Sequence, residues 1–254
     1  MKDLPPEASK QVEVLLQKIE ELTQSQRQLL TIASHDIKSP FNRMHALLQL
    51  VQMNAANLTD EQKNYLEKMH IVIADGMAMI RNLIDYRNLE FQGIELMPVS
   101  FTLREFIHTS LKAVDGVARK KQLNLISGII DDHELHTDRH CLQHAFDNLL
   151  SNAIKFSFPG KAVTVRTACT GPDATIEIED EARGFLPDEQ KQLFQKFSRL
   201  SNRPTGGESS TGLGLYIAQS MMKKINGYVE CLNTEGVGSV FRLVFPMRLD
   251  QLKR

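Results

Sequence analysis

Apolar residues along the first part of the chain recur at spacings of three and four, which is the period of an amphipathic helix. They form a heptad seam with a polar break at Gln26, made of Val12, Leu15, Ile19, Leu22, Gln26, Leu29 and Ala33. We expect this helix to continue past Pro40 towards Asn54, with a bend just past His35, because proline cannot donate its helical hydrogen bond.

A second amphipathic helix follows a turn, and Thr59 to Gln62 have the sequence of a capping box at its start. Its apolar stripe consists of Tyr65, Leu66, Met69, Val72, Ile73, Met77, Ile80, Leu83 and Ile84. Two antiparallel helices that each carry a wide apolar face do not cover that surface by themselves. The pattern therefore predicts a helical hairpin that dimerises into a four-helix bundle.

The helical periodicity breaks around Gly93 to Pro98, and we place a domain boundary there. Beyond it we expect helices at about 102–121, 139–156 and 211–226, with a short one from Pro187. Gly227 is expected as the residue that ends the third of these helices. Strands are expected at 123–127, 134–137, 162–169, 174–179, 228–232 and 239–245. This mixture predicts an α/β two-layer sandwich. The expected organisation is multi-domain, with a leading coiled-coil helix over 1–23, the all-α hairpin over 24–92 and the sandwich over 97–249.

Composition narrows the class of protein. The 254 residues carry a net charge of −1, which argues against a nucleic-acid partner. No apolar run is long enough to cross a bilayer, and the amino terminus has no signal-peptide core. The three cysteines form no CxxC pair, which favours buried reduced thiols. We expect a cytoplasmic protein, or the cytoplasmic part of a larger or membrane-attached sensor.

Candidate chemistry begins at His35, in the run Ser34-His35-Asp36-Ile37-Lys38-Ser39-Pro40. The histidine lies two residues from the heptad seam, which places it on the exposed flank of the helix. An adjacent acid can fix the tautomer of the imidazole and leave its far nitrogen free as a nucleophile.

A second constellation offers binding groups for a nucleotide. Asn148, Asn152 and Lys155 share one face of the helix expected at 139–156, where amide oxygens suit hydrated Mg²⁺ and the ammonium suits phosphate. The run from Thr211 to Leu215 combines glycines with a helix start, which binds phosphate through free N–H groups. Asp180, at the end of a predicted strand, could accept hydrogen bonds from the amino group of adenine. Each signal is weak when taken alone.

Taken in order, these segments resemble the sensor histidine kinases of two-component systems, from about Gln24 to Arg248. Residues 34–41 resemble the H box of their dimerisation and histidine-phosphotransfer domain. Residues 148–156 resemble the N box of their ATP-binding domain, which has the GHKL or Bergerat fold. The remaining boxes are represented by Asp180 to Gly184 (G1), Leu193 to Phe197 (F), Gly212 to Gly214 (G2) and Gly236 to Ser239.

The resemblance implies roles for individual residues. His35 would attack the γ-phosphate of ATP, Asp36 would orient the imidazole and accept its proton, and Asn152 would be the Mg²⁺ ligand. The nucleotide-binding set implied is Asn148, Asn152, Lys155, Phe156, Asp180, Gly184, Thr211, Gly212, Leu213 and Gly214. A mobile lid over the nucleotide would span about Phe185 to Ser210.

Two residues depart from the family pattern. Ala182 replaces the usual glycine of the G1 box, so we expect weakened nucleotide binding. Ser39 stands where many relatives have Thr or Asn, the position linked to phosphatase activity. A hydroxyl that satisfies the backbone beside Pro40 is an equal explanation of that serine.

The function implied is an ATP-dependent protein-histidine kinase, homodimeric through the hairpin, that autophosphorylates His35. It would pass the phosphoryl group to an aspartate in the receiver domain of a separate response regulator. The alternative is a degenerate nucleotide-binding dimeric scaffold, or a response-regulator phosphatase with weak kinase activity. A GHKL ATPase of the chaperone or mismatch-repair type is disfavoured, because such proteins lack an H box on a preceding hairpin.

Overall fold

The computed structural model describes residues 6–53, 58–87, 89, 95–129, 132–198, 200–208, 210–234 and 236–249. Within these ranges only the backbone is described for residues 6–10, 13, 19, 20, 22–36, 87, 233 and 234. The chain divides into two compact units, residues 1–92 and residues 93–254, and each is considered by itself.

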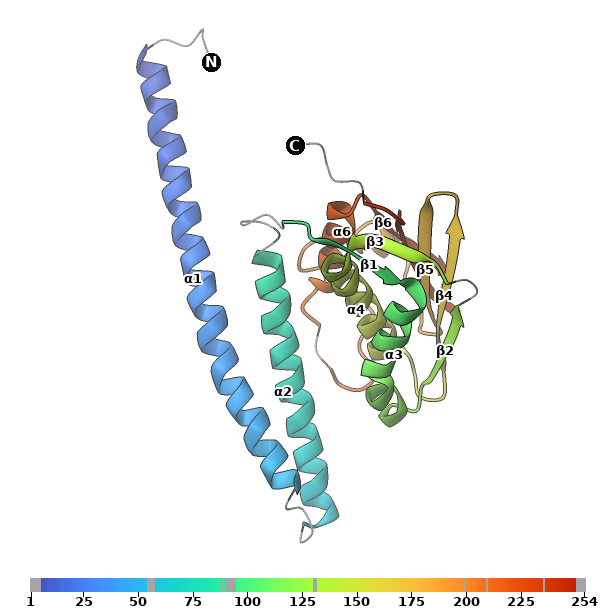
Figure 1. The fold of residues 1–254 in the computed structure, drawn as a ribbon. Coiled ribbons are helices and arrows are strands. Elements are labelled where there is room, and N and C mark those ends of the chain that lie inside the picture. The colour runs from blue at the N-terminus through green and yellow to red at the C-terminus, as the bar shows by residue number, and fades with distance from the viewer. Residues whose placement is uncertain are drawn as a thin grey trace. The chain divides into compact units, whose positions relative to one another are not determined.

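The first unit is a helical hairpin of α1 (Pro6–Met53) and α2 (Asp60–Arg87), in which α2 lies beside the C-terminal part of α1 (Figure 1). The predicted capping box is confirmed at the start of α2. The Thr59 N–H donates to Gln62 Oε1 at 2.9 Å, and the Gln62 N–H donates to Thr59 Oγ1 at 3.2 Å. Pro40 lies inside α1, which is one continuous helix, and the bend expected just past His35 stays a prediction.

The two helices are in close contact at Gly76. A Cβ placed on Gly76 would lie 2.1 Å from Cε1 of Phe41, the residue that follows Pro40. No side chain larger than hydrogen fits there without displacing the ring. The glycine in α2 is therefore what allows Phe41 of α1 to pack against the α2 backbone.

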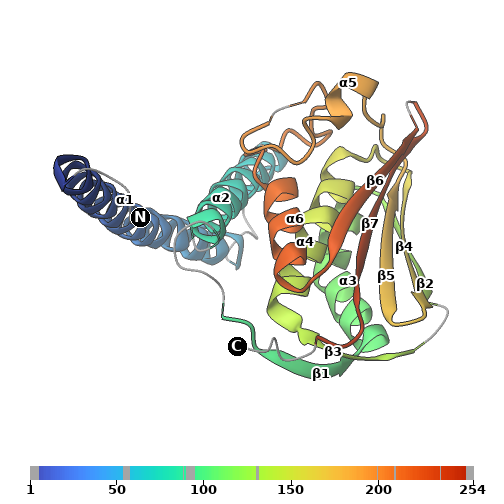
Figure 2. The same ribbon diagram turned by 90° about the horizontal axis from the view of Figure 1, so that it is seen from above.

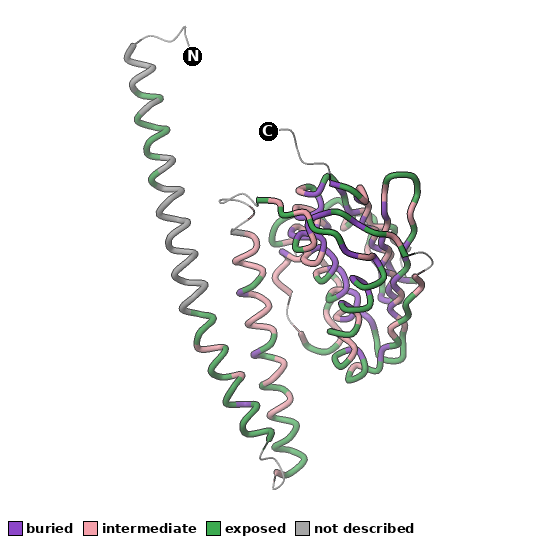
Figure 3. The backbone as a smooth tube through the Cα atoms, in the orientation of Figure 1, coloured by how far each residue is buried: buried purple, intermediate pink, exposed green. Residues whose placement is uncertain are grey.

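The hairpin leaves much apolar surface uncovered. Among its residues whose side chains are described, only Leu48, Ile73 and Ile80 are buried, and Figure 3 shows the others of this set as exposed or half-buried. The exposed apolar side chains include Met44, Leu47, Leu50, Val51, Tyr65, Met69 and Val72. One hairpin therefore does not bury the apolar stripes that the sequence predicts for it.

The second unit is the expected two-layer α/β sandwich, in which three helices cover one face of a five-stranded sheet (Figure 2). The sheet order is β2-β4-β5-β7-β6, with β2 parallel to β4 and the other neighbours antiparallel. The strands of this sheet are β2 (Asn124–Ile129), β4 (Ala162–Thr170), β5 (Asp173–Asp180), β6 (Tyr228–Thr234) and β7 (Gly238–Pro246). The covering helices are α3 (Leu103–Lys120), α4 (Arg139–Phe156) and α6 (Gly214–Lys224). A separate two-stranded sheet pairs β1 (Pro98–Thr102) with β3 (Glu134–Asp138), and α5 (Pro187–Gln190) is a single turn.

Local signals placed several of these elements correctly. α4 has the predicted bounds, and it begins after Asp138, whose Oδ1 accepts from the Cys141 N–H at 2.8 Å. The hairpin around Gly171 joins β4 to β5 as predicted, and Pro187 opens α5. Thr102 caps α3 through its hydroxyl, whereas the Glu105 carboxylate accepts from Arg139 Nη2 at 3.2 Å. The described bonds at Thr102 therefore form only one half of a capping box.

One strand of the second unit was missed, and two expectations about α6 were wrong. Strand β1 was not predicted. α6 begins at Gly214 rather than at 211, because Gly212 has a left-handed φ of 70° that the helix cannot include. At the other end Asn226, with a φ of 58°, is the left-handed residue in place of Gly227. Gly227 is needed for another reason, since a Cβ on it would lie 2.5 Å from the Val244 carbonyl oxygen.

The structure tests two expectations drawn from composition, that the cysteines are buried reduced thiols and that no segment is apolar enough to cross a bilayer. All three cysteines are free, but only Cys141 is fully buried, and Cys169 and Cys231 are half-buried. Burial raises the pKa of the Cys141 thiol to about 12, so it stays protonated near neutral pH. Within the described ranges, none of the helices combines the length and apolar character that a membrane span requires.

Candidate functional site

The N-box face of α4 meets the start of α6. The opposite face of α4 is anchored in the core by eight buried residues, among them Leu149, Leu150 and Ala153. Asn148 and Asn152 are half-buried on the side that faces α6. A Cβ placed on Gly214 would lie 3.0 Å from Asn148 Oδ1 and 3.8 Å from Asn152 Nδ2. The structure thus brings together both asparagines and the second glycine of the predicted G2 box.

The amide of Asn148 is oriented by its own helix. Its Nδ2 donates to the His144 carbonyl oxygen at 2.8 Å, and its Oδ1 lies on the side of Gly214. An amide oxygen directed at a glycine-bounded space is a suitable ligand for Mg²⁺ or for water bound to it. Among the described residues no group of three or more His, Cys, Asp and Glu could hold a metal ion. A cation at this face would therefore take its ligands from amide oxygens, water and phosphate.

The start of α6 has no side-chain cap. Leu213 occupies the N-cap position, and its apolar side chain cannot accept from the N–H groups of the first turn. The Leu213 N–H itself donates to Thr211 Oγ1 at 3.3 Å, which shapes the turn before the helix. Gly212 packs against the predicted lid, since a Cβ on it would lie 2.5 Å from the Ser198 carbonyl oxygen. The positive end of α6 is therefore available to an anion beside Asn148.

Asp180 ends β5 as a buried carboxyl group that is 5% exposed. Its Oδ1 accepts from the Ala182 N–H at 3.0 Å, and its Oδ2 accepts from the Ser239 hydroxyl at 2.9 Å. Burial raises the pKa of Asp180, while these two hydrogen bonds act in the opposite direction. Each carboxylate oxygen can accept a second hydrogen bond, so the fixed group can still receive an amino group of a ligand.

The glycine turn between β6 and β7 supports Asp180 directly. Gly238 has a φ of 140°, and a Cβ on it would lie 2.0 Å from the Asp180 carbonyl oxygen. The Gly236 N–H donates to the Arg183 carbonyl oxygen at 2.7 Å. The G1 loop and the third glycine turn are therefore held together as one structure around the carboxylate.

Ser239 was not among the predicted site residues. It lies opposite Asp180 in the β5–β7 register, which joins strands about sixty residues apart. A single hydroxyl residue after a glycine turn gives no local signal of such a contact. Knowledge of the strand pairing would have revealed it.

The predicted lid contacts α6 and the G1 loop. Leu193 of the predicted F box is buried, whereas Phe197 is exposed. Lys196 Nζ lies 5.0 Å from the centre of the Tyr216 ring on α6. The Asn202 side chain donates to the Gly184 carbonyl oxygen at 2.6 Å, which connects the lid to the end of the G1 loop.

The phosphoacceptor segment is described only in part. The backbone of His35 and Asp36 is helical within α1, but their side chains lie outside the described residues. Ser39 is exposed on the same helix. Lys155 and Phe156 are half-buried at the end of α4, next to the lid.

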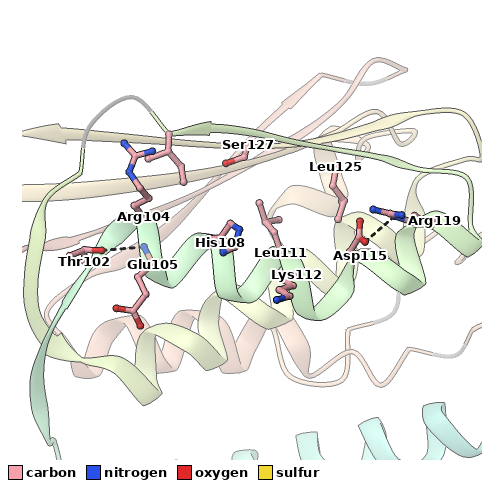
Figure 4. Close-up of a pocket in the computed structure, with 11 residues that line it drawn as sticks. Thr102, Arg104, Glu105, His108, Leu111, Lys112, Asp115, Arg119, Leu125 and Ser127 are labelled. Carbon is pink, nitrogen blue, oxygen red and sulfur yellow. Dashed lines mark hydrogen bonds and ion pairs between the residues drawn. The ribbon is translucent and has the colours of Figure 1, made fainter.

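A separate groove of about 680 Å³ lies between α3 and the edge strand β2 of the second unit (Figure 4). Its walls include Arg104, His108 and Leu125, together with the Asp115–Arg119 ion pair at 2.9 Å. None of the predicted nucleotide-binding residues lines it. The groove is therefore not the nucleotide site that the sequence predicts.

Two family models match the chain. Residues 25–92 match the His Kinase A (phospho-acceptor) domain, and residues 137–249 match the histidine kinase-, DNA gyrase B- and HSP90-like ATPase. The first match contains His35, and the second contains every predicted nucleotide-binding residue.

Individual relatives agree with the family models. The chain is 28% identical over 227 residues to the sensor histidine kinase GacS of Pseudomonas protegens, covering 87% of the chain and 24% of GacS. It is 28% identical over 241 residues to the sensor protein EvgS of Escherichia coli O157:H7, covering 90% of the chain and 19% of EvgS. The chain thus spans about a quarter or less of the length of these relatives.

Solved structures share the fold. Full-length ShkA in complex with AMPPNP aligns with a TM-score of 0.67 at 20% identity, over 86% of this chain and 45% of ShkA. The histidine kinase AdeS of Acinetobacter baumannii aligns with a TM-score of 0.58 at 19% identity, over 84% of this chain and 98% of AdeS. With a phosphoacceptor domain followed by an ATPase domain over well more than half of its length, the chain belongs to the sensor histidine kinase family.

Proposed function

We propose that this protein is an ATP-dependent histidine kinase that phosphorylates its own His35 and then transfers the phosphoryl group to an aspartate of a separate response regulator. The observation that carries the proposal is the convergence of Asn148, Asn152 and the uncapped start of α6 at Gly214. This arrangement offers amide oxygens and backbone N–H groups at one place, as a polyphosphate with a bound cation requires.

Each part of ATP would meet a different element. Asp180, fixed by Ala182 and Ser239, would accept from the amino group of adenine. The N–H groups at the start of α6 would bind phosphate oxygens, and Lys155 would add a positive charge nearby. Asn152, with Asn148 beside it, would hold Mg²⁺, which lowers the negative charge of the phosphates when it is bound.

The reaction itself is a displacement at phosphorus. The unprotonated ring nitrogen of His35 attacks the γ-phosphorus, the bond from that phosphorus to the β,γ-bridging oxygen breaks, and ADP leaves. Asp36 would hold the proton on the other ring nitrogen and accept it as the phosphoimidazole forms. The same phosphoryl group would then pass to the carboxylate of a receiver domain, which regenerates the free imidazole.

A homodimer through the hairpin is part of this proposal. Its support is the exposed apolar surface on both helices, which includes Leu47 and Leu50 of α1 and Val72 of α2. Pairing two hairpins into a four-helix bundle would cover these side chains. Light scattering coupled to size exclusion is expected to give twice the chain mass of 28.8 kDa, and a monomer at micromolar concentration would contradict it.

Autophosphorylation tests the kinase proposal. Incubation with γ-labelled ATP is expected to give an acid-labile label that is absent from His35→Gln and retained in the control His45→Gln. Adding a panel of receiver domains to the labelled protein is expected to move the label to one of them. Nucleotide binding without any label would favour the degenerate scaffold, and absence of both would remove the proposal.

A further inference from the structure

Lys121 is a nearly buried cation that belongs to none of the recognised boxes. It follows the last residue of α3, and its side chain is 11% exposed. Its Nζ donates to the carbonyl oxygens of Ile154 at 2.8 Å and Lys155 at 2.6 Å, and to Glu208 Oε1 at 3.0 Å. All three protons of the ammonium group therefore have partners.

Two of these partners are carbonyl groups of the last turn of α4. Such carbonyls have no partner within the helix and carry the negative end of its dipole, which a cation stabilises. α4 is also the helix that presents Asn148 and Asn152. Lys121 is thus bound to the far end of the helix that forms one wall of the predicted nucleotide site.

The third partner belongs to the predicted lid. The Glu208 side chain is 19% exposed, and its other oxygen accepts from the Gly206 N–H at 2.8 Å. In the same short segment the Thr205 N–H donates to the Lys155 carbonyl oxygen at 3.0 Å, and the Thr205 hydroxyl donates to the Ser157 carbonyl oxygen at 2.6 Å. Residues 205–208 are therefore docked on the end of α4 by side-chain and backbone bonds together.

Burial decides how much the ion pair contributes. Exposed ion pairs contribute little, because water competes for both charges. A pair as buried as Lys121 and Glu208 behaves differently, since removing one partner leaves the other charge desolvated and unpaired. Loss of the Glu208 charge would leave a buried ammonium, and the lid segment would have to open to admit water.

We propose that Lys121 and Glu208 form a latch that fixes the C-terminal part of the lid to α4 and so sets how fast nucleotide leaves. Both are positioning residues, because they act through the lid and through α4 rather than on the nucleotide. The effect on nucleotide release rests on the proposed function. The effect on the lid itself does not.

The test compares Glu208→Gln and Lys121→Met with wild type by hydrogen exchange and by release of a fluorescent ATP analogue. Without nucleotide, both variants are expected to exchange amide hydrogens in residues 201–208 about tenfold faster than wild type, as loss of a charged hydrogen bond allows. Release of the analogue is expected to accelerate by about the same factor. Lys121→Arg, which keeps the charge and the donors, is expected to restore values near those of wild type.

Asp115→Asn is the matched control. It removes one carboxylate from α3, the helix that Lys121 follows, but the ion pair it breaks is exposed: the side chain of Asp115 is 44% exposed and that of Arg119 is 77% exposed. It is expected to change neither measurement. Unchanged exchange in Glu208→Gln would overturn the latch, even in a protein that binds nucleotide normally. Faster exchange with unaltered release would overturn its role in nucleotide release. If wild type binds no nucleotide, the proposed function fails, and the exchange experiment still decides the latch.

Discussion

Replacing Gly214 by alanine separates binding from stability, because the two effects are expected to have opposite signs. Gly214 is the first residue of α6, and its φ is not in the left-handed region, so alanine causes no backbone strain there. Alanine is also the better helix former, by up to about 1 kcal/mol in a helix interior and by less at a terminus. The folded protein should therefore be as stable as wild type or slightly more stable, provided that the half-buried Asn148 amide shifts by the few tenths of an ångström that the methyl group requires.

Nucleotide affinity should fall in the same variant. The new methyl group would lie 3.0 Å from Asn148 Oδ1, which is tighter than ordinary contact, so the amide must move. It would also keep a phosphate from approaching the helix backbone closely. Loss of one hydrogen bond to a charged ligand costs about 1.5–3 kcal/mol, or roughly a tenfold to hundredfold rise in the dissociation constant.

The assay is fluorescence anisotropy of a labelled ATP analogue, with urea unfolding followed in parallel. The chain contains no tryptophan, so protein fluorescence interferes little with the label. Gly116→Ala is the matched control, because a Cβ on that glycine of α3 meets no atom within 4 Å. It should gain stability and bind nucleotide like wild type. Wild-type affinity in Gly214→Ala would refute the placement of the phosphates beside Asn148.

Three further results are expected. Gly238→Ala should lower the free energy of unfolding in urea by about 3 kcal/mol or more, because Gly238 has a φ of 140° and a Cβ there would lie 2.0 Å from the Asp180 carbonyl oxygen. A loss below about 1 kcal/mol would be inconsistent with that contact. Gly76→Ala should lower the free energy of unfolding by about 1–3 kcal/mol, because the new methyl group displaces the Phe41 ring. Adding Phe41→Leu should relieve part of that loss, whereas strictly additive losses in the double variant would argue against the contact. Native Cys141, with its pKa raised by burial to about 12, should resist alkylation at pH 8.5 and react after unfolding, and rapid modification of the folded protein would show that it is accessible.

The sequence was sufficient where structure is encoded locally. α4 begins after a capping residue, Asp138, and carries apolar residues at helical spacing. Its bounds were predicted correctly. The capping box at Thr59 is likewise a matter of four consecutive residues. That Asn148 and Asn152 lie on the same face of α4 follows from the helical period alone. Their meeting with Gly214 was expected only from the resemblance to a family.

What the sequence did not predict depends on pairing between distant segments. Strand β1 has only five residues and begins with Pro98, and it is stabilised by its pairing with β3, in which Asp138 lies opposite Pro98. The bond from Ser239 to Asp180 requires the β5–β7 register. The contact of Lys121 with Glu208 spans 87 positions between a helix end and a loop. No periodicity in the sequence reports such a contact.

We propose that His35 attacks the γ-phosphate of an ATP molecule held by the site around Asp180 and Asn152. The most direct measurement is peptide mapping, under conditions that preserve phosphohistidine, after incubation with ATP and Mg²⁺. Phosphate is expected on the peptide that contains His35 in wild type, and on no peptide in a folded Asp180→Asn variant. Phosphate on another residue, or undiminished phosphate on His35 in Asp180→Asn, would contradict the account.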